Sequence, residues 1–149
     1  MRLLTRSRAT VLSATLAAAA AFAQPAATPA NDTLYQQLGG QAGLVTLMDD
    51  FMTRLIADRR MGPFFKDVDH KHVKEQLVAQ FCEVSGGPCK LKGPDRKKAH
   101  AGIDVTRADF NSLVEVLQQS MDAQGITFGV QNRLLAKLAP MHREIINSP

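Results

Sequence analysis

Apolar side chains recur every three or four residues in four stretches of the chain, which is the spacing of one buried helix face. The first two stretches are Leu44, Leu47, Met48, Phe51, Leu55, Ile56 and Val73, Leu77, Phe81, Val84. The last two are Phe110, Leu113, Leu117, Met121 and Val130, Leu134, Leu138, Met141, Ile145. No stretch alternates as a strand would. The pattern predicts an all-α domain of four substantial helices.

Glycine and proline mark where these helices are expected to end. A short first helix over residues 34–38 stops at Gly39-Gly40, and Gly62-Pro63 interrupts the chain after Ala57. Gly86-Gly87-Pro88 ends the second long stretch, where glycine can take left-handed angles. Gly102 follows a short helix that ends near His100, and Gly125 separates the last two long helices.

Four residues allow further predictions about the last two long helices. Thr106 and Asp109 have the spacing of a capping box, with Asp in place of Glu. Thr127 is expected to cap the final helix. Pro140 lies inside the apolar pattern of that helix, so we expect a kink or a break there.

The stretch from residue 86 to residue 106 is long, polar and poor in large apolar side chains. Long connections in compact domains usually carry function. The four helices could pack into a plain bundle. Alternatively, they could leave a slot that something other than side chains fills.

The N-terminus has the pattern of an export signal. Basic residues up to Arg8 precede an apolar stretch from Val11 to Ala23, and Ala21-Phe22-Ala23 offers small residues at a cleavage site. An N-terminal membrane anchor is the alternative, but about 20 apolar residues are needed to span a bilayer and this stretch is shorter. We therefore expect a signal peptide over residues 1–23, a disordered leader over 24–33 and a folded domain over 34–147. The mature protein is then periplasmic or secreted, with no stable membrane insertion.

Charge argues against a nucleic-acid partner. The whole chain has 18 basic and 14 acidic residues, a formal net charge of +4. Arg2, Arg6 and Arg8 lie in the expected signal peptide, so the mature domain is nearly neutral.

Cys82 and Cys89 are the chain's two cysteines and flank the glycine turn. A zinc site would need two more ligands, and no C-x-x-C pair occurs. C-x-x-C-H is also missing, which excludes covalent c-type haem. With an export signal, a disulfide is favoured.

Several motifs in order resemble the group I truncated haemoglobins. The opening run is Leu34-Tyr35-Gln36-Gln37-Leu38-Gly39-Gly40. It is followed by Asp50-Phe51, Ala57-Asp58, Pro63-Phe64-Phe65, Gly86-Gly87-Pro88 and the run from Ala99 to Thr106. The ordered set covers nearly the whole domain. The resemblance implies a two-over-two helical sandwich around haem b (iron protoporphyrin IX).

The resemblance also implies roles for individual residues. His100 matches the proximal histidine that binds the haem iron, and neutral imidazole suits that role. Phe65 matches a phenylalanine that packs on the haem plane. Further cavity walls are expected from Phe51, Phe81 and Val73.

The ligand side departs from the family pattern. Met52 stands where group I proteins commonly have a tyrosine, and Leu77 stands at a position that often carries glutamine. Losing such a donor predicts faster oxygen release, unless Gln76 or Gln80 turns inward. Alternatively, the Met52 thioether could bind iron, giving a His/Met electron carrier, or it could simply fill apolar space.

Basic residues near the expected cavity form a further group. His72 matches a position near the haem propionates, and Lys97 and Lys98 could pair with propionates too. A spacing of two puts His70 and His72 on different faces of a helix, so a shared metal site would need an extended segment.

The resemblance implies a haem protein that reversibly binds oxygen and other diatomic ligands, for transport, storage or sensing. Nitric oxide dioxygenation is the enzymatic alternative. It would need an external reductase, because no flavin or nicotinamide motif occurs here. A haem-free helical adaptor is a third possibility. Expected small ligands are O2, NO and CO.

Overall fold

The computed structural model describes residues 33–149. The predicted signal peptide and residues 24–32 of the predicted leader lie outside the described residues. Thr33 was assigned to the leader, but its hydroxyl caps α1 (Leu34–Gln37) by accepting from the Gln36 backbone N–H. The Gln36 side chain accepts from the Thr33 N–H in return, which completes a capping box. Thr33 therefore takes part in the first helix of the folded domain.

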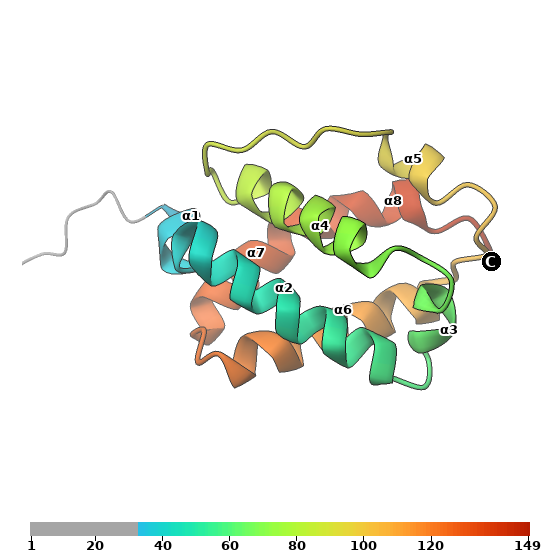
Figure 1. Cartoon of the computed structure of the whole chain (residues 1–149), viewed down its shortest axis with the longest axis horizontal. Helices are drawn as coiled ribbons and strands as arrows, with labels where there is room; N and C mark the ends of the chain where they lie inside the picture. The colour runs from blue at the N-terminus through green and yellow to red at the C-terminus, as the bar shows by residue number, and fades with distance from the viewer. Residues whose placement is uncertain (1–32) are drawn as a thin grey trace, which may run out of the picture. The chain divides into compact units, whose positions relative to one another are not determined.

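The described residues form helices and no strands, as the apolar spacing predicts (Figure 1). Four long helices make the frame: α2 (Gly40–Ala57), α4 (His70–Val84), α6 (Arg107–Ala123) and α7 (Phe128–Leu138). Short helices lie between or after them: α3 (Gly62–Phe65), α5 (Arg96–Ala99), the 3-10 turn η1 (Ala139–Met141) and α8 (His142–Ile145). Within residues 33–149, no helix is both long and apolar enough to cross a membrane.

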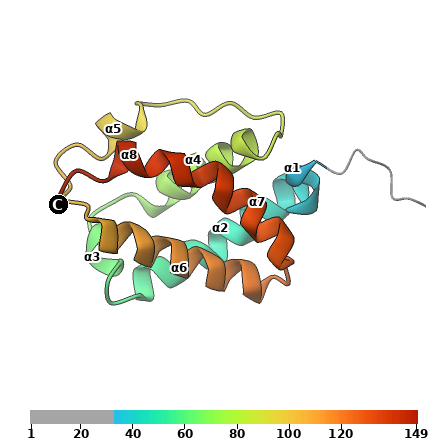
Figure 2. The same ribbon diagram turned by 180° about the vertical axis from the view of Figure 1, so that it is seen from behind.

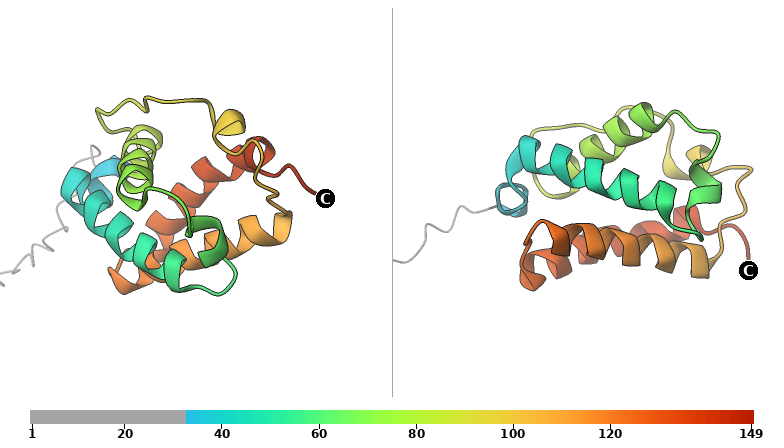
Figure 3. Two further views of the ribbon diagram at one scale, coloured as in Figure 1. Left: turned by 45° about the vertical axis from the view of Figure 1, so that its right-hand side comes forward. Right: turned by 60° about the horizontal axis from the view of Figure 1, so that its bottom comes forward.

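The long helices form two layers. Figure 3 shows α2 and α4 together on one side, with α6 and α7 on the other. Helix α2 packs against both α4 and α6, so it connects the layers. Its side chains Leu44, Leu47, Met48 and Leu55 are fully buried between them. This is the predicted two-over-two sandwich.

Two predictions about α2 and α7 need correction. Ile56 was expected on the buried face of α2, but its side chain is 45% exposed. One residue is about 100° of helical rotation, so Ile56 turns away from the stripe that Leu55 continues. Thr127 occupies the N-cap of α7, but its side chain makes no capping hydrogen bond.

The remaining helix boundaries follow the predicted signals. Thr106 and Asp109 form a complete capping box at the start of α6. Gly62-Pro63 does more than interrupt the chain, because it opens α3 with proline in the first turn. Pro140 breaks the last helix, and the chain continues through η1 into α8.

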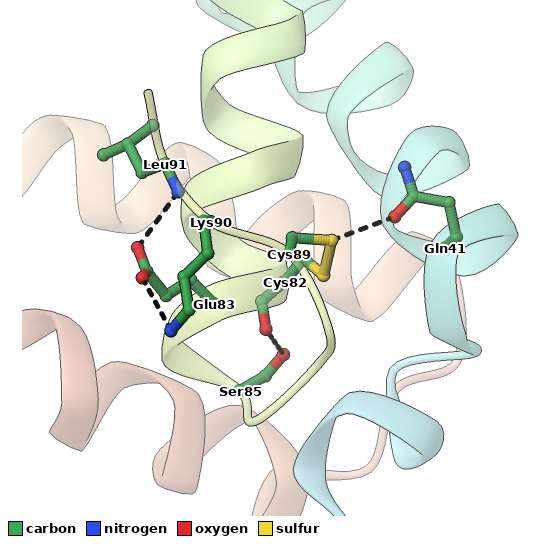
Figure 4. Close-up of a disulfide and its surroundings, with 7 residues drawn as sticks. All are labelled: Gln41, Cys82, Glu83, Ser85, Cys89, Lys90 and Leu91. Carbon is green, nitrogen blue, oxygen red and sulfur yellow. Dashed lines mark hydrogen bonds and ion pairs between the residues drawn. A yellow bond between two sulfur atoms is a disulfide. The ribbon is translucent and has the colours of Figure 1, made fainter. Parts of the chain in front are cut away.

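The turn after α4 is held by a disulfide and by close packing. Cys82 and Cys89 are joined, with their Cα atoms 5.7 Å apart (Figure 4). A Cβ on Gly87 would lie 2.6 Å from the Cys82 Sγ and 2.6 Å from the Tyr35 ring, so only glycine fits here. The Tyr35 backbone N–H donates to the Ser85 carbonyl at 3.0 Å, which ties the turn to α1.

Candidate functional site

A cavity of about 620 Å³ opens between the two layers, on the side where the polar stretch of residues 86–106 runs. Every helix from α2 onward contributes lining residues, whereas α1 contributes none. A cavity of this size is typical of a site for a cofactor or a drug-sized ligand. The predicted slot therefore exists, and the plain bundle does not describe this fold.

Helix α4 presents one face to the cavity. Its lining residues recur at the spacing of a single helix face and include Val73, Gln76, Leu77, Gln80 and Phe81. The apolar members dominate the middle of this face. The two amides flank Leu77, so they are the polar groups that α4 can offer to a ligand.

Aromatic side chains from α2 and α3 close one end of the cavity. Phe51 is 1% exposed and lies in the wall, with Phe64 and Phe65 beside it. The structure thus brings Phe51, Phe65, Val73, Leu77 and Phe81 to one cavity, as the sequence predicted.

The opposite wall comes from the second half of the chain. It is almost wholly apolar and is formed by Ile103, Val105, Phe110, Leu113, Leu117, Leu138, Met141 and Ile145. The apolar spacing predicts helix faces for most of these residues but gives none of them a role in a site. Their common apolar character suits a large, flat, hydrophobic ligand.

His100 lies in this cavity, directly after α5, and is half-buried. Its Nδ1 atom is 2.8 Å from the backbone oxygen of Arg96. A hydrogen bond from Nδ1–H to a carbonyl fixes the tautomer, so Nε2 keeps its lone pair. An imidazole held in this way is prepared to act as an axial metal ligand through Nε2.

Basic side chains lie at the rim of the cavity. His72, Lys92 and Arg96 line it, and the Arg96 Nε donates to the Glu144 carboxylate at 2.8 Å. The place of His72 near the propionates stays a prediction. Among the described residues, Lys97 and Lys98 do not line the cavity, and their pairing with propionates stays a prediction. Arg96 and His100 are four residues apart and share one side of the turn, whereas Lys97 is rotated away.

Met52 also departs from its predicted place. It is 5% exposed and packs in the hydrophobic core, and it is not among the described residues that line the cavity. Phe51 faces the cavity, and the next residue along a helix points about 100° away. The structure therefore gives no support to a Met52–iron bond.

The two predicted ligand-side amides differ in their contacts. The Gln80 Nε2 donates to the Met141 Sδ at 3.1 Å, across the cavity wall. A Cβ added to Gly93 would lie 3.3 Å from the Gln76 Oε1. The Gln76 amide thus lies against the polar stretch of residues 86–106.

His70 and His72 do not converge. Both lie in the first turn of α4 and both are exposed. The His70 Nε2 is 2.6 Å from the Phe65 carbonyl oxygen. Within residues 33–149 there is no cluster of three or more His, Cys, Asp or Glu side chains that could hold a metal ion.

Comparison with known proteins decides the family. The model of the family described as bacterial-like globin matches residues 33–147. The chain belongs to the bacterial-like globin family. The group 1 truncated hemoglobin of Tetrahymena pyriformis is 30% identical to this globin over 100 residues, covering 67% of this chain and 83% of that protein.

Further similarities agree with this assignment. The group 1 truncated hemoglobin of Mycolicibacterium paratuberculosis is 28% identical over 113 residues, which cover 76% of this globin and 83% of that protein. The crystal structure of the Tetrahymena pyriformis truncated hemoglobin in its Fe(III) form superposes with a TM-score of 0.75. That match is 26% identical and covers 78% of this globin and 99% of the other chain.

The residues of this globin fit haem. The cavity is large and mostly apolar, its lining includes an imidazole whose Nδ1 contacts a backbone carbonyl, and three basic side chains line it as well. Apolar walls suit a porphyrin, the imidazole suits iron, and basic groups suit propionates. Family membership and this donor set together support haem, with haem b as the usual form.

Proposed function

We propose that this globin holds one haem b with His100 as the axial ligand and reversibly binds oxygen and other small diatomic ligands. The single observation that carries the proposal is the Nδ1 contact of His100 with the Arg96 carbonyl inside an apolar cavity. Bound haem supplies an iron centre that takes up a diatomic ligand. The chain's residues hold and orient that centre and exclude bulk water.

Each wall has a separate task in this proposal. The His100 imidazole would bind the iron, and the Phe65 ring would lie against the porphyrin. His72, Lys92 and Arg96 would neutralise the propionates. The cavity-lining face of α4 offers Val73 and Leu77, which cannot donate hydrogen bonds, so a bound polar ligand is held weakly there.

The test is an absorption spectrum of the purified domain with added haem, in the ferric, ferrous and CO-treated forms. The wild type should give a Soret band that shifts with CO. His100→Ala should lose this spectrum, and external imidazole should restore it. His142→Ala is the matched control, because His142 lies on α8 and is not a cavity-lining residue in the described part of the chain.

A spectrum in which His100→Ala matches the wild type would overturn the proposal. A wild type without any Soret band after haem titration would favour the haem-free adaptor. For physiological use, we propose oxygen binding ahead of nitric oxide dioxygenation, because the weak hydrogen bonding on α4 favours rapid ligand exchange over a long-lived oxygen complex.

We also propose that the protein is exported. The N-terminal pattern of residues 1–23 and the joined Cys82–Cys89 pair both support an oxidising compartment outside the cytoplasm. Intact mass of the protein from a periplasmic fraction tests this. Export predicts cleavage near Ala23 and a mass that increases by two hydrogens on reduction. An uncleaved chain with free thiols in the cytoplasm would contradict it.

A further inference from the structure

Helix α5 is too short to hold His100 in place by itself. It spans Arg96–Ala99, a single turn, and an isolated turn is unstable because nucleating a helix costs more than one hydrogen bond returns. The side chain of Asp95 caps it by accepting from the Lys98 N–H at 2.8 Å. The remaining restraint must come from elsewhere in the fold.

The C-terminal segment provides that restraint. Helix α8 lies beside α5, as Figure 2 shows, and Glu144 accepts from Arg96. Beyond α8, the backbone N–H groups of Asn147 and Ser148 both donate to the Val105 carbonyl at 3.1 Å. The last residues are thereby fixed along the segment that follows His100.

The Asn147 side chain completes this arrangement with two further bonds. Its Nδ2 donates to the His100 carbonyl at 3.0 Å, and its Oδ1 accepts from the Val105 N–H at 2.8 Å. One amide thus joins both ends of the loop of residues 101–104, which contains Gly102 at φ +83°. A side-chain amide carries a donor nitrogen and an acceptor oxygen, so Asn147 can make both bonds at once.

We propose that Asn147 is a positioning residue for the proximal histidine, and that the C-terminal segment sets the geometry of the iron–imidazole bond. The inference rests on the proposed function, because it needs His100 to be the axial ligand. Two hydrogen bonds meet at His100: the Arg96 carbonyl contacts the ring Nδ1 and orients the imidazole, and the Asn147 Nδ2 donates to the His100 carbonyl and anchors the peptide group that follows the ring.

Two substitutions separate the contributions of Asn147. Asn147→Ala removes both side-chain bonds. Asn147→Asp keeps an acceptor for the Val105 N–H but sets a carboxylate oxygen against the His100 carbonyl. If the anchor on His100 matters, both variants should release haem faster than the wild type. One neutral hydrogen bond corresponds to about a two- to tenfold change.

The experiment measures haem transfer to excess apomyoglobin and the iron–histidine stretching band of the ferrous protein by resonance Raman spectroscopy. We expect faster haem transfer and a shifted or broadened band in both Asn147 variants. Ser148→Ala is the matched control, since it keeps both backbone bonds to Val105 and loses only a 3.5 Å contact with Asp104.

The outcomes are separable. A band and a transfer rate equal to wild type in both folded variants would overturn the positioning role. The positioning role is also overturned if Asn147→Ala lowers only the stability of the apoprotein, because that outcome indicates a structural role alone. If Asn147→Ala does not fold, Asn147→Asp decides. A wild type without an iron–histidine band would instead contradict the proposed function.

Discussion

The side-chain amide of Gln80 lies 3.1 Å from the Sδ of Met141 and so links α4 to η1 across the cavity wall. A thioether is a weak hydrogen-bond acceptor, but among the described residues the Met141 sulfur is the group to which the Gln80 amide donates. The contact directs Gln80 toward the second half of the chain. Leu77, four residues before Phe81 on the same face, is left as the central side chain of α4.

Leu77→Gln should slow oxygen dissociation. A donor placed in the middle of the α4 face would add one hydrogen bond to a bound polar ligand, worth about 1 kcal/mol, or roughly fivefold in rate. Stopped-flow displacement of oxygen by CO measures this. Leu77→Met is the control, because it keeps the volume and adds no donor. Equal rates in Leu77→Gln and Leu77→Met would show that α4 does not face the ligand.

Thr106→Ala should lower the free energy of unfolding by about 1 kcal/mol, because it removes the side-chain half of a complete capping box at the start of α6. Thr127→Ala is a matched control. Thr127 holds the equivalent N-cap position in α7 without a side-chain hydrogen bond, so its loss should change the unfolding free energy by less than about 0.5 kcal/mol. Urea unfolding of the two variants compares them. Equal losses would mean that the Thr106 hydroxyl does not cap α6.

Replacing both Cys82 and Cys89 by serine should lower the unfolding free energy by about 2–3 kcal/mol, the chain-entropy value for a loop of this length. The covalent link also holds the segment that leads to Leu91 and Lys92. Figure 4 shows Glu83 binding this segment, by accepting from the Leu91 N–H and pairing with Lys90. Denaturant unfolding with and without reductant measures the effect.

Reductant supplies the internal control for that prediction. The wild type should lose stability on reduction, and the double serine variant should not respond. Wild-type protein that unfolds identically with and without reductant would contradict a stabilising disulfide.

The helix pattern could be predicted from sequence because burial follows apolar spacing, as in Leu44, Leu47 and Leu55. The role of His100 as the iron ligand was predicted from the family resemblance, since a single histidine has no spacing pattern that would indicate it. Arg96 was missed in favour of Lys97, although its separation of four residues from His100 places both on one side of a turn. That spacing was a usable signal.

Asn147 could not have been found in this way. Its two side-chain bonds join backbone groups more than forty residues away, at His100 and Val105. Backbone donors and acceptors have no residue identity, so no pattern in the sequence points to them.

The exposure of Ile56 was missed for a different reason. A side chain at the edge of the apolar face of a helix is buried only if a neighbouring element covers it, and the sequence does not show which element does.

Asp58→Asn should destabilise the domain at neutral pH and have little effect in strong acid. The Arg60 guanidinium and backbone N–H hold the pKa of the Asp58 carboxyl at about 2, below its ordinary value of 3.8. A depressed pKa means that the folded state favours the charged form, so the stabilisation is complete above pH 3.8 and is lost as pH falls through 2. Asparagine keeps an acceptor for the Arg60 and Met61 N–H groups, so the variant removes the charge selectively. The gap in urea midpoint between the wild type and Asp58→Asn should therefore be full at pH 7, nearly full at pH 4 and much narrower at pH 2.5. Asp67→Asn, at an exposed carboxylate without an ion pair in residues 33–149, should track the wild type throughout. A gap between Asp58→Asn and the wild type that stays constant down to pH 2.5 would mean that the Asp58 charge does not stabilise the fold.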